Sequence, residues 1–239
     1  MVRTVQAAAA WVDEVGLALL FPKADVVLPS LWEQVNGSPA DNWAIRDAEG
    51  NFVRWSDELS FLWGAKDELP GQGLVCVGKH VARVATCVAP RLLPVLVAAA
   101  EPVEPSVGEQ AIEEAVGAEG PLTGPQLRNL TGLEKKEVDR TVAVLHRRLV
   151  LTNSHLVEQD GPWGAIAHEL LVRKWDVRKV PGREDARREL ARLVLDLAGE
   201  LTAADLAGPF GWPRKTAAAV LESVGVGRDE EGFRIWAAH

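Results

Sequence analysis

The stretch LEKKEVDRTVAVLHRRL, residues 133–149, carries the clearest pattern in the chain, and its neighbours are best interpreted around it. On a helix that turns about 100° per residue, its apolar side chains form one stripe and most of its basic side chains form another, on roughly the opposite side. The apolar stripe consists of Val138, Val142, Leu145 and Leu149. The opposite stripe consists of Lys136, Arg140, Ala143 and Arg147. Such a helix either docks on a core and offers its basic side to a DNA groove, or carries charges that are only solvated.

A short helix and a turn precede this stretch. Thr123 is a suitable N-cap for a helix over residues 123–130, because its hydroxyl can accept a backbone N–H that the helix leaves unpaired, and Pro125 suits the first turn. Gly132 then breaks the chain before the long helix begins. A short helix, a turn with glycine and a second amphipathic helix predict a helix-turn-helix.

The flanking residues extend this motif. Residues 109–118 predict a preceding helix, and residues 150–157 predict a small hairpin that turns at Asn153-Ser154. Three helices followed by a hairpin describe a winged helix. Residues 160–162 should then begin a further helix over residues 163–175, whose apolar side chains recur at helical spacing.

The same pattern recurs 79 residues later without a gap, where residues 120–145 overlay residues 199–224. The matches include the cap, core positions, the turn glycine and the basic start of the second helix. They pair Gly120 with Gly199, Thr123 with Thr202, Leu127 with Leu206, Gly132 with Gly211, Lys136 with Lys215, Val142 with Leu221 and Leu145 with Val224. This register predicts a tandem repeat of one supersecondary unit.

The last unit is expected to hold a helix over residues 187–198, a second from Thr202 and a third that begins at Trp212-Pro213. A closing hairpin over residues 224–236 should turn at residues 228–232. The positions that repeat, or that lie on the inward stripes, should be buried. They are Leu127, Val138, Val142, Leu145, Leu206, Leu221 and Val224.

The predicted fold class is mostly α with short β-hairpins, an α+β chain of tandem winged-helix units. Two stretches rich in proline or glycine, residues 101–106 and 180–182, are candidate linkers. They predict an N-terminal helical, winged-helix-like domain over residues 1–104, a central winged-helix domain with an extra helix over 105–180, and a C-terminal winged-helix domain over 181–239.

Composition and charge narrow the function. The chain has 239 residues, 47% of them hydrophobic, and a net charge of −8, which argues against a strong general DNA binder. The charge is unevenly placed: residues 1–120 carry a net −9, residues 121–182 a net +3 and residues 183–239 a net −2. A polyanion should therefore bind the central unit, while the acidic N-terminal half faces away or meets a protein partner.

Other features favour a cytoplasmic protein without a cofactor. Cys76 and Cys87 form no C-x-x-C motif, which is typical of a reducing compartment and predicts no metal site. Asp13 and Glu14 interrupt the apolar N-terminal residues, so we expect no signal peptide, and no apolar run is long enough to span a membrane. His155 and His168 lack partners at metal-ligand spacing and are expected to be surface or structural residues. No catalytic or phosphate-binding motif is present.

Nine tryptophans without a tyrosine are unusual, and five of them precede residue 64. Stacking on unpaired bases is one use for such rings, and packing in the core is the more frequent one.

The segments VGLALLFP (15–22), LPSLWEQVNG (28–37) and KDELPGQG (66–73), together with the winged-helix tail, resemble one known group. The chain is similar to bacterial winged-helix proteins related to the AlkZ-type DNA glycosylases, which unhook alkylated and crosslinked bases. The resemblance implies a series of winged helices around a DNA-binding channel. That family's catalytic signature, two glutamines spaced by one residue, is absent here, so no catalytic residue is assigned. The glutamines are all isolated: Gln6, Gln34, Gln72, Gln110, Gln126 and Gln159.

These observations predict a protein that binds double-stranded DNA in the setting of DNA repair, in the cytoplasm at the nucleoid, without chemistry of its own. The residues expected to contact DNA are Lys135, Lys136, Arg140, Arg147, Arg214 and Lys215. One alternative is a divergent glycosylase that positions its water with Asp67 or Glu68. Another is an acidic winged-helix scaffold that binds proteins.

Overall fold

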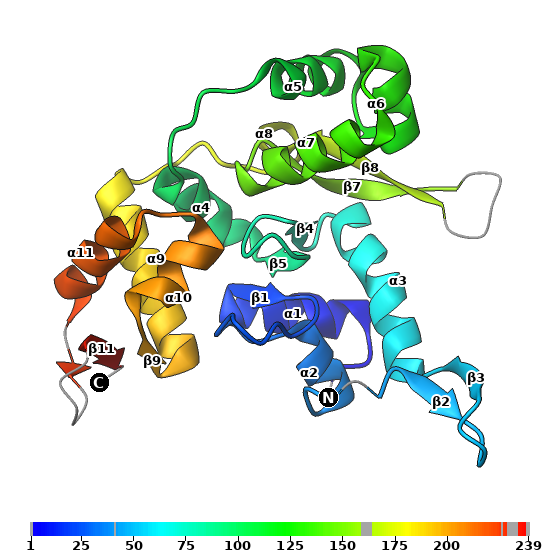
Figure 1. Ribbon diagram of the computed structural model, residues 1–239, viewed down its shortest axis with the longest axis horizontal. Coiled ribbons are helices and arrows are strands. Elements are labelled where there is room, and N and C mark those ends of the chain that lie inside the picture. The colour runs from blue at the N-terminus through cyan, green and yellow to red at the C-terminus, as the bar shows by residue number, and fades with distance from the viewer. Residues whose placement is uncertain (1, 41, 159–163, 226, 229–233, 238–239) are drawn as a thin grey trace.

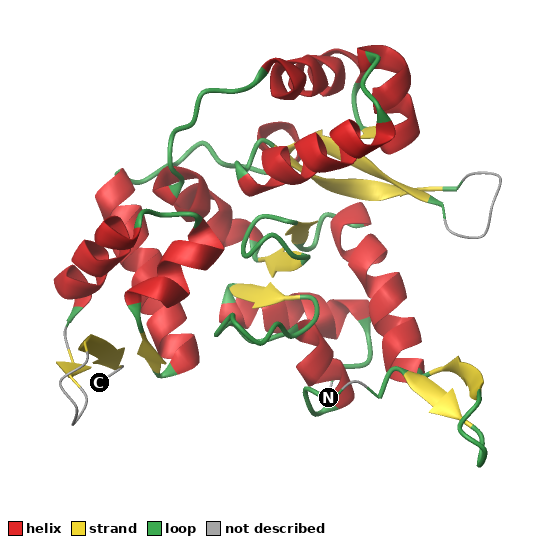
Figure 2. Ribbon diagram, viewed as in Figure 1, coloured by secondary structure: helices red, strands yellow, loops and turns green. Residues whose placement is uncertain are grey.

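The computed structural model describes residues 2–40, 42–158, 164–225, 227–228 and 234–237. Helices predominate and the strands form small antiparallel sheets, so the chain is of mixed α and β structure, as predicted (Figure 2). The helices are α1 Val5–Val15, α2 Leu31–Asn36, α3 Asp57–Gly71, the 3-10 turn η1 Pro90–Leu92, α4 Leu93–Ala99, α5 Val107–Glu119, α6 Gly124–Thr131, α7 Lys135–Arg147, α8 Leu171–Lys174, α9 Arg183–Ala198, α10 Ala203–Phe210 and α11 Arg214–Val224. The strands are β1 Leu17–Leu19, β2 Ala44–Arg46, β3 Phe52–Trp55, β4 Cys76–Gly78, β5 Thr86–Val88, β6 Leu122–Thr123, β7 Leu151–Val157, β8 Ala165–Leu170, β9 Glu200–Leu201, β10 Gly227–Arg228 and β11 Arg234–Ala237.

The N-terminal part, residues 2–104, combines helices with a three-stranded sheet in the order β1-β5-β4 and with the separate hairpin β2-β3. Helix α1 begins where the sequence predicts, because the Thr4 hydroxyl accepts the N–H of Ala7 at 3.1 Å. It ends at Gly16, whose φ of 78° suits glycine. Trp32 of α2 and Leu62 and Leu69 of α3 are fully buried in the core between these elements.

The central segment, residues 107–174, contains α5, α6, α7 and α8 and a three-stranded sheet in the order β6-β8-β7. Thr123 caps α6 through a capping box with Gln126, and Gly132 ends α6 in the left-handed conformation. Val138, Val142 and Leu145 of the predicted inward stripe are buried here, as predicted. Leu149 is also buried, but it lies beyond the end of α7 with a left-handed φ of 59° and packs in another core, so its place on the helix was predicted wrongly. This segment has its own hydrophobic core, formed by Ile112, Val116, Leu122, Leu127, Val138, Val142, Leu145 and Leu151.

Two predictions for the end of the central segment were wrong. Residues 151–157 form one strand instead of a hairpin, and the polar pair Asn153-Ser154 lies at a shift in strand register instead of at a turn. Residues 165–170 form β8 instead of a helix, and only α8 after them is helical. Pairing with β6 on one side and β7 on the other satisfies the backbone of β8, and this tertiary pairing overrides the helical spacing of its apolar residues. The predicted start of that helix, residues 160–162, lies outside the described residues.

The C-terminal segment, residues 183–225 with β10 and β11, packs on a different core. Leu206 and Leu221 are fully buried there, as predicted, together with residues of α4 and β1 from the N-terminal part. Val224 is only partly buried, because it ends α11, and in this respect the prediction was wrong. Strands β10 and β11 pair as an antiparallel hairpin, and the predicted turn lies, apart from Arg228, outside the described residues.

Figure 1 shows the central segment at the top of the view, the C-terminal segment at the left and the N-terminal part at the lower right. Helix α4 lies beside α9, and α3 and β4 lie beside β7, so the N-terminal part contacts both other segments. Within the described ranges, none of the helices has the length and apolarity that crossing a membrane would require.

Candidate nucleic-acid interface

Helix α7 places the predicted basic residues on its solvent side. Lys135, Lys136 and Arg140 are exposed, while Val138 and Val142 on the other side pack into the central core. None of these three basic side chains forms an ion pair with any residue that the structure describes. The start of α7 therefore offers unneutralised positive charge to solvent.

Arg147, at the end of α7, is in a different environment. It is half-buried, and its guanidinium packs so closely on Gly211 that a Cβ at that glycine would lie 2.6 Å from Nη2 of Arg147. The pKa of Arg147 is lowered by burial and then by the charge of Arg83. The structure thus brings two arginines together from segments that are far apart in sequence.

These arginines line a cavity of about 820 Å³ that also includes Lys23 and the start of α10. The carboxylates nearby are already engaged, since Asp25 pairs with Lys23 at 3.1 Å and Asp205 accepts the Thr202 N–H at 2.7 Å in the capping box of α10. Among the described residues, neither Arg83 nor Arg147 has an ion-pair partner. Two like-charged guanidiniums that form no ion pair with a described residue would be stabilised by an anion such as a phosphate.

The loop after β4 holds Arg83 in position. Ala82 and Arg83 adopt left-handed φ values of 54° and 59°, which are uncommon for residues other than glycine. The N–H of Ala82 donates to the carbonyl of Pro209 at 2.9 Å, so the loop is attached to α10. The strain of these two residues is offset by a contact that orients the Arg83 backbone.

A second cavity, of about 360 Å³, lies next to the same loop and opens beside α7. It is lined by polar and charged groups that include Lys79, Asp139, Asn153 and His168. Lys79 is exposed, which adds another basic side chain from the β4–β5 loop to the surroundings of α7. No three His, Cys, Asp or Glu side chains gather as a metal site in the part of the chain that the structure describes.

Two buried histidines, His80 and His146, and the partly buried His168 join the central segment to the β4–β5 loop behind this cavity. His146 Nδ1 accepts the N–H of Lys79 at 3.2 Å, so its other nitrogen carries the proton and donates to His168 Nδ1 at 3.1 Å. His80 Nδ1 donates to the carbonyl of His146 at 2.7 Å, which leaves Nε2 to accept the thiol proton of Cys76 at 3.3 Å. Each bond in which a ring nitrogen accepts therefore requires that ring to be neutral.

Burial explains why these rings are neutral. Desolvation lowers the pKa of His80 and of His168 to about 4, and it lowers the pKa of His146 well below the usual value. Burial likewise raises the pKa of the Cys76 thiol to about 12. His168 is partly buried and lines the 360 Å³ cavity, whereas His155 is exposed.

Arg214 and Lys215 are exposed at the start of α11 and have no ion-pair partner among the described residues. Lys215 lines a separate cavity of about 420 Å³ against Arg187 and Arg188 of α9. Figure 1 shows α11 at the far left and α7 at the top. The structure therefore does not gather all six predicted residues on one site.

Sequence reasoning missed Lys23, Lys79 and Arg83. The only available signal was the short basic stretch of residues 79–83, and its meaning depends on a loop whose left-handed residues cannot be inferred from composition. The two carboxylates suggested for a glycosylase lie elsewhere, on α3. Asp67 pairs with Lys66 at 2.7 Å, and Glu68 accepts the side-chain amide of Gln72 at 3.3 Å.

Comparisons with known proteins bear on the fold. No established protein family matches the sequence, and no curated protein matches it either. The DNA glycosylase AlkZ of Streptomyces sahachiroi has a similar structure, with a TM-score of 0.55 and 15% sequence identity over 97% of this chain. The match covers 64% of the AlkZ chain, so this chain spans less than two thirds of its length. At this level of identity the likeness shows that the resemblance to the AlkZ group holds for the fold.

Proposed function

We propose that this chain binds double-stranded DNA through α7 and the basic loop beside it, in the setting of DNA repair at the nucleoid. The observation that carries the proposal is the pair of arginines, Arg83 and Arg147, that face one cavity without a carboxylate partner among the described residues. The exposed Lys136 and Arg140 extend this positive surface along the helix. A row of unpaired basic groups is what a phosphate backbone requires of a protein.

We further propose that the central and C-terminal segments are two winged-helix units that arose as a tandem repeat. Their element boundaries support this, because corresponding boundaries lie 79 residues apart. This holds for the ends of α5 and α9, for both ends of α6 and α10, and for the starts of α7 and α11. In each segment a strand before the second helix pairs with a later strand, as in a helix-turn-helix followed by a wing. In such a unit the third helix enters the groove.

The domain division at residues 1–104, 105–180 and 181–239 is part of the same proposal. Residues 102–104 are exposed at the first boundary, and so are residues 178–180 near the second. Limited proteolysis tests it, with first cuts expected at these two places. The C-terminal fragment should stay bound after the cut, because Leu206 and Leu221 share a core with α4. Early cuts inside α7 would contradict the division.

Measuring duplex binding across salt concentrations tests the DNA proposal. Replacing Lys136, Arg140 and Arg147 with alanine should lower the slope of log K against log salt by about 0.9 for each phosphate that the variant no longer neutralises, and so by roughly 2 to 3 units. Replacing Arg83 as well should lower the slope further. Replacing Lys136 and Arg140 should change the melting temperature little, because substitutions at exposed sites usually cost under about 0.5 kcal/mol. Arg147 is half-buried against Gly211, so its replacement should cost more.

A matched control removes three charges elsewhere. Lys179, Arg183 and Arg192 are exposed and have no ion-pair partner among the described residues. Their triple alanine variant has the same net charge as the α7 variant, and it should keep the slope of the unmodified protein. An equal decrease in both variants would show that only net charge matters, and an unchanged α7 variant would leave the scaffold alternative, in which the acidic N-terminal half binds a protein.

We infer excision of a damaged base as the second candidate, since this is the activity named for the structural neighbour. One observation favours it: the carboxylate of Asp139 and the amide of Asn153 line the 360 Å³ cavity beside α7. A carboxylate in such a place can orient an attacking water. Release of an alkylated base from duplex DNA tests this candidate, and Asp139→Asn should abolish release while Asp67→Asn should not.

A further inference from the structure

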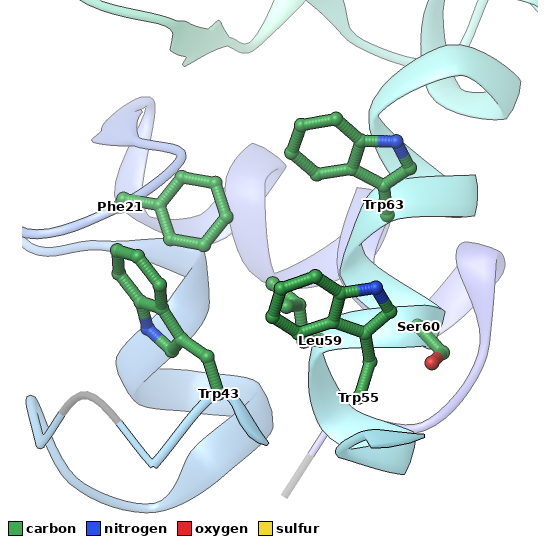
Figure 3. Close-up of a pocket in the computed structure, with 6 residues that line it drawn as sticks. All are labelled: Phe21, Trp43, Trp55, Leu59, Ser60 and Trp63. Carbon is green, nitrogen blue, oxygen red and sulfur yellow. The ribbon is translucent and has the colours of Figure 1, made fainter. Parts of the chain in front are cut away.

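An aromatic cavity in the N-terminal part has no role in DNA binding as proposed above. It lies between the segment before β2, the end of β3 and helix α3, and its volume is about 560 Å³ (Figure 3). The side chains that line it are Phe21, Trp43, Trp55, Leu59, Ser60 and Trp63. Cavities that bind small molecules in proteins span roughly 300 to 1,000 Å³ and are mostly apolar, so both the size and the lining suit a ligand.

One wall of the cavity is a preorganised aromatic cluster. The ring of Phe21 lies 5.7 Å from that of Trp43, and both rings pack on Trp32, at 6.0 and 6.5 Å. Trp32 is fully buried and donates its indole N–H to the carbonyl of Ala40 at 3.1 Å. This hydrogen bond and the buried ring hold Phe21 and Trp43 in place before any ligand arrives.

Trp55 and Trp63 form the opposite wall. Figure 3 shows their six-membered rings pointing toward Phe21 and Trp43, with their ring nitrogens on the far side. Phe52 contacts Trp55 edge-on at 4.8 Å, and the ammonium of Lys66 lies 4.7 Å from the ring of Trp63. The two walls therefore present ring carbons to the space between them.

The cavity offers almost no polar group. Ser60 lines it, but its hydroxyl donates to the carbonyl of Ser56 at 2.9 Å. Three tryptophans around the space remain about half exposed, at 43% for Trp43, 50% for Trp55 and 49% for Trp63. Leaving so much aromatic surface in water is unfavourable, and a ligand that covers it gains the corresponding hydrophobic free energy.

The charges around the cavity are already neutralised. Arg3 pairs with Glu58 at 2.7 Å, and Lys66 pairs with Asp67 at 2.7 Å. Arg54 and Asp57 form a third pair across the start of α3. An aromatic cage for a cation works best beside a free carboxylate, and an anion needs a free basic group. Because the nearby charges are paired, neither a cationic nor an anionic ligand is favoured here. A nucleobase carries polar edges that would lose their hydrogen bonds in this cavity.

We propose that this cavity is a binding site for a neutral, planar, predominantly aromatic small molecule, which inserts its ring system between Phe21 and Trp43 on one side and Trp55 and Trp63 on the other. The site is independent of the DNA-binding proposal, since it draws on the N-terminal part alone.

Titration of the full chain with N-phenyl-1-naphthylamine, a neutral aromatic dye that fluoresces in apolar surroundings, tests this site. We expect saturable binding of one dye, with a Kd on the order of 10 µM. Trp63→Ala should weaken binding at least about tenfold, because it removes one wall. Val53→Ala is the control, since Val53 is an exposed apolar residue of β3, the strand that also carries Trp55, and does not line the cavity. This variant should bind the dye normally.

A second variant keeps the test decisive if Trp63→Ala alters folding. Ser60 is exposed on α3 and borders the cavity, so Ser60→Leu should fill it and exclude the dye while the circular dichroism spectrum stays unchanged. Equal dye binding by the unmodified chain, Trp63→Ala and Ser60→Leu would overturn the proposal. Displacement of the dye by single-stranded DNA, or loss of dye binding as the chain dimerises at higher concentration, would assign the cavity to a nucleic acid or to a second copy and would also overturn it.

Discussion

The central and C-terminal segments share the same helix caps and turn glycines, but their helices pack in different cores. Gly132 ends α6 and Gly211 ends α10 with the same φ of 70°, and a threonine capping box precedes each helix. The central segment nevertheless has a core of its own around Val142, and Leu149 and Leu171 of this segment join the core that contains α4 and β1. Among the described residues, the buried hydrophobic side chains of the C-terminal segment all belong to that shared core. Caps and turn glycines therefore determine where helices start and stop, and the neighbouring elements determine what those helices pack against.

The two segments are also attached to the N-terminal part by different chemistry. The central segment is attached partly by hydrogen bonds of the β4–β5 loop: His146 accepts the N–H of Lys79, which requires a neutral ring, and His80 donates to the carbonyl of His146. Leu149 and Leu171 add apolar contacts, since they belong to the core that contains α4.

The C-terminal segment is attached mainly by apolar contacts between α9 and α4, supported by the ion pair of Arg187 with Glu101 at 2.8 Å. Because the histidine contacts titrate in mild acid and the apolar contacts between α9 and α4 do not, acid and core substitutions should affect the two attachments in different ways.

The largest effect should come from a charge in either core. Leu221→Asp and Val142→Asp should each lower the free energy of unfolding by about 4 kcal/mol or more, because an unpaired carboxylate is costly to bury. Hydrogen exchange should then separate the two segments. Leu221→Asp should expose α9, α10, α11 and α4 together, since they share a core, while Val142→Asp should expose residues 107–170 and spare α4. If Val142→Asp left the melting temperature unchanged, the separate central core would be refuted.

The second-largest effect should come from mild acid, which should weaken the histidine contacts between the central segment and the β4–β5 loop. The folded pKa of His80 and of His168 is about 4, below the ordinary value of about 6.5, so the unfolded chain binds more protons between these values. The free energy of unfolding should therefore have its full value above about pH 6.5. It should decrease toward pH 5 by up to about 1.4 kcal/mol per pH unit for each of these histidines. Urea unfolding at a series of pH values measures this.

Two histidine variants sharpen the same measurement. His168→Gln should reduce the slope of stability against pH, while His155→Gln, which removes an exposed histidine from β7, should leave it unchanged. Hydrogen exchange at pH 5 should rise first around residues 76–80 and 146–168, and α9 to α11 should respond less. A uniform response of all segments would mean that the histidines do not form the sensitive contact.

Added bulk at Gly78 should have the third-largest effect. A Cβ at this position would lie 2.5 Å from His146 Nδ1 and 2.5 Å from His80 Nε2, so Gly78→Ala should cost about 1 to 3 kcal/mol. Gly208→Ala in α10 is the matched control, because no heavy atom lies within 4 Å of its added Cβ, and alanine favours a helix interior. Thermal melting should show opposite shifts for the two variants. A neutral Gly78→Ala would mean that the histidine contact adjusts freely.

The smallest effect should be on DNA binding through α11. Replacing Arg214 and Lys215 with alanine should lower the salt slope less than the α7 variant does, because Ala219 stands where α7 has Arg140 and the C-terminal unit is net negative. Duplex binding across salt measures both variants side by side. A decrease as large as that of the α7 variant would show that both segments contact DNA equally.

Much of the fold was predictable from local pattern. Thr4, Thr123 and Thr202 mark helix starts, and Gly16, Gly132 and Gly211 mark helix ends, because capping and left-handed turns depend on a few neighbouring residues. The apolar stripe of α7 was likewise readable, since helical geometry alone places its members on one side. The aromatic cavity was not predicted: core packing was the more frequent use expected for the early tryptophans, and Trp32 packs in the core, but Trp43, Trp55 and Trp63 are half exposed.

The rest depended on long-range contacts. Residues 165–170 have helical spacing but form β8, because two neighbouring strands pair with their backbone. Arg83 joins Arg147 only because the loop after β4 adopts left-handed residues and bonds to Pro209. Local pattern in the sequence was sufficient for most helix ends, for their caps and for the basic side of α7. Which basic groups share a cavity, and which tryptophans face each other, depends on the packing of distant segments, because no local pattern relates those residues.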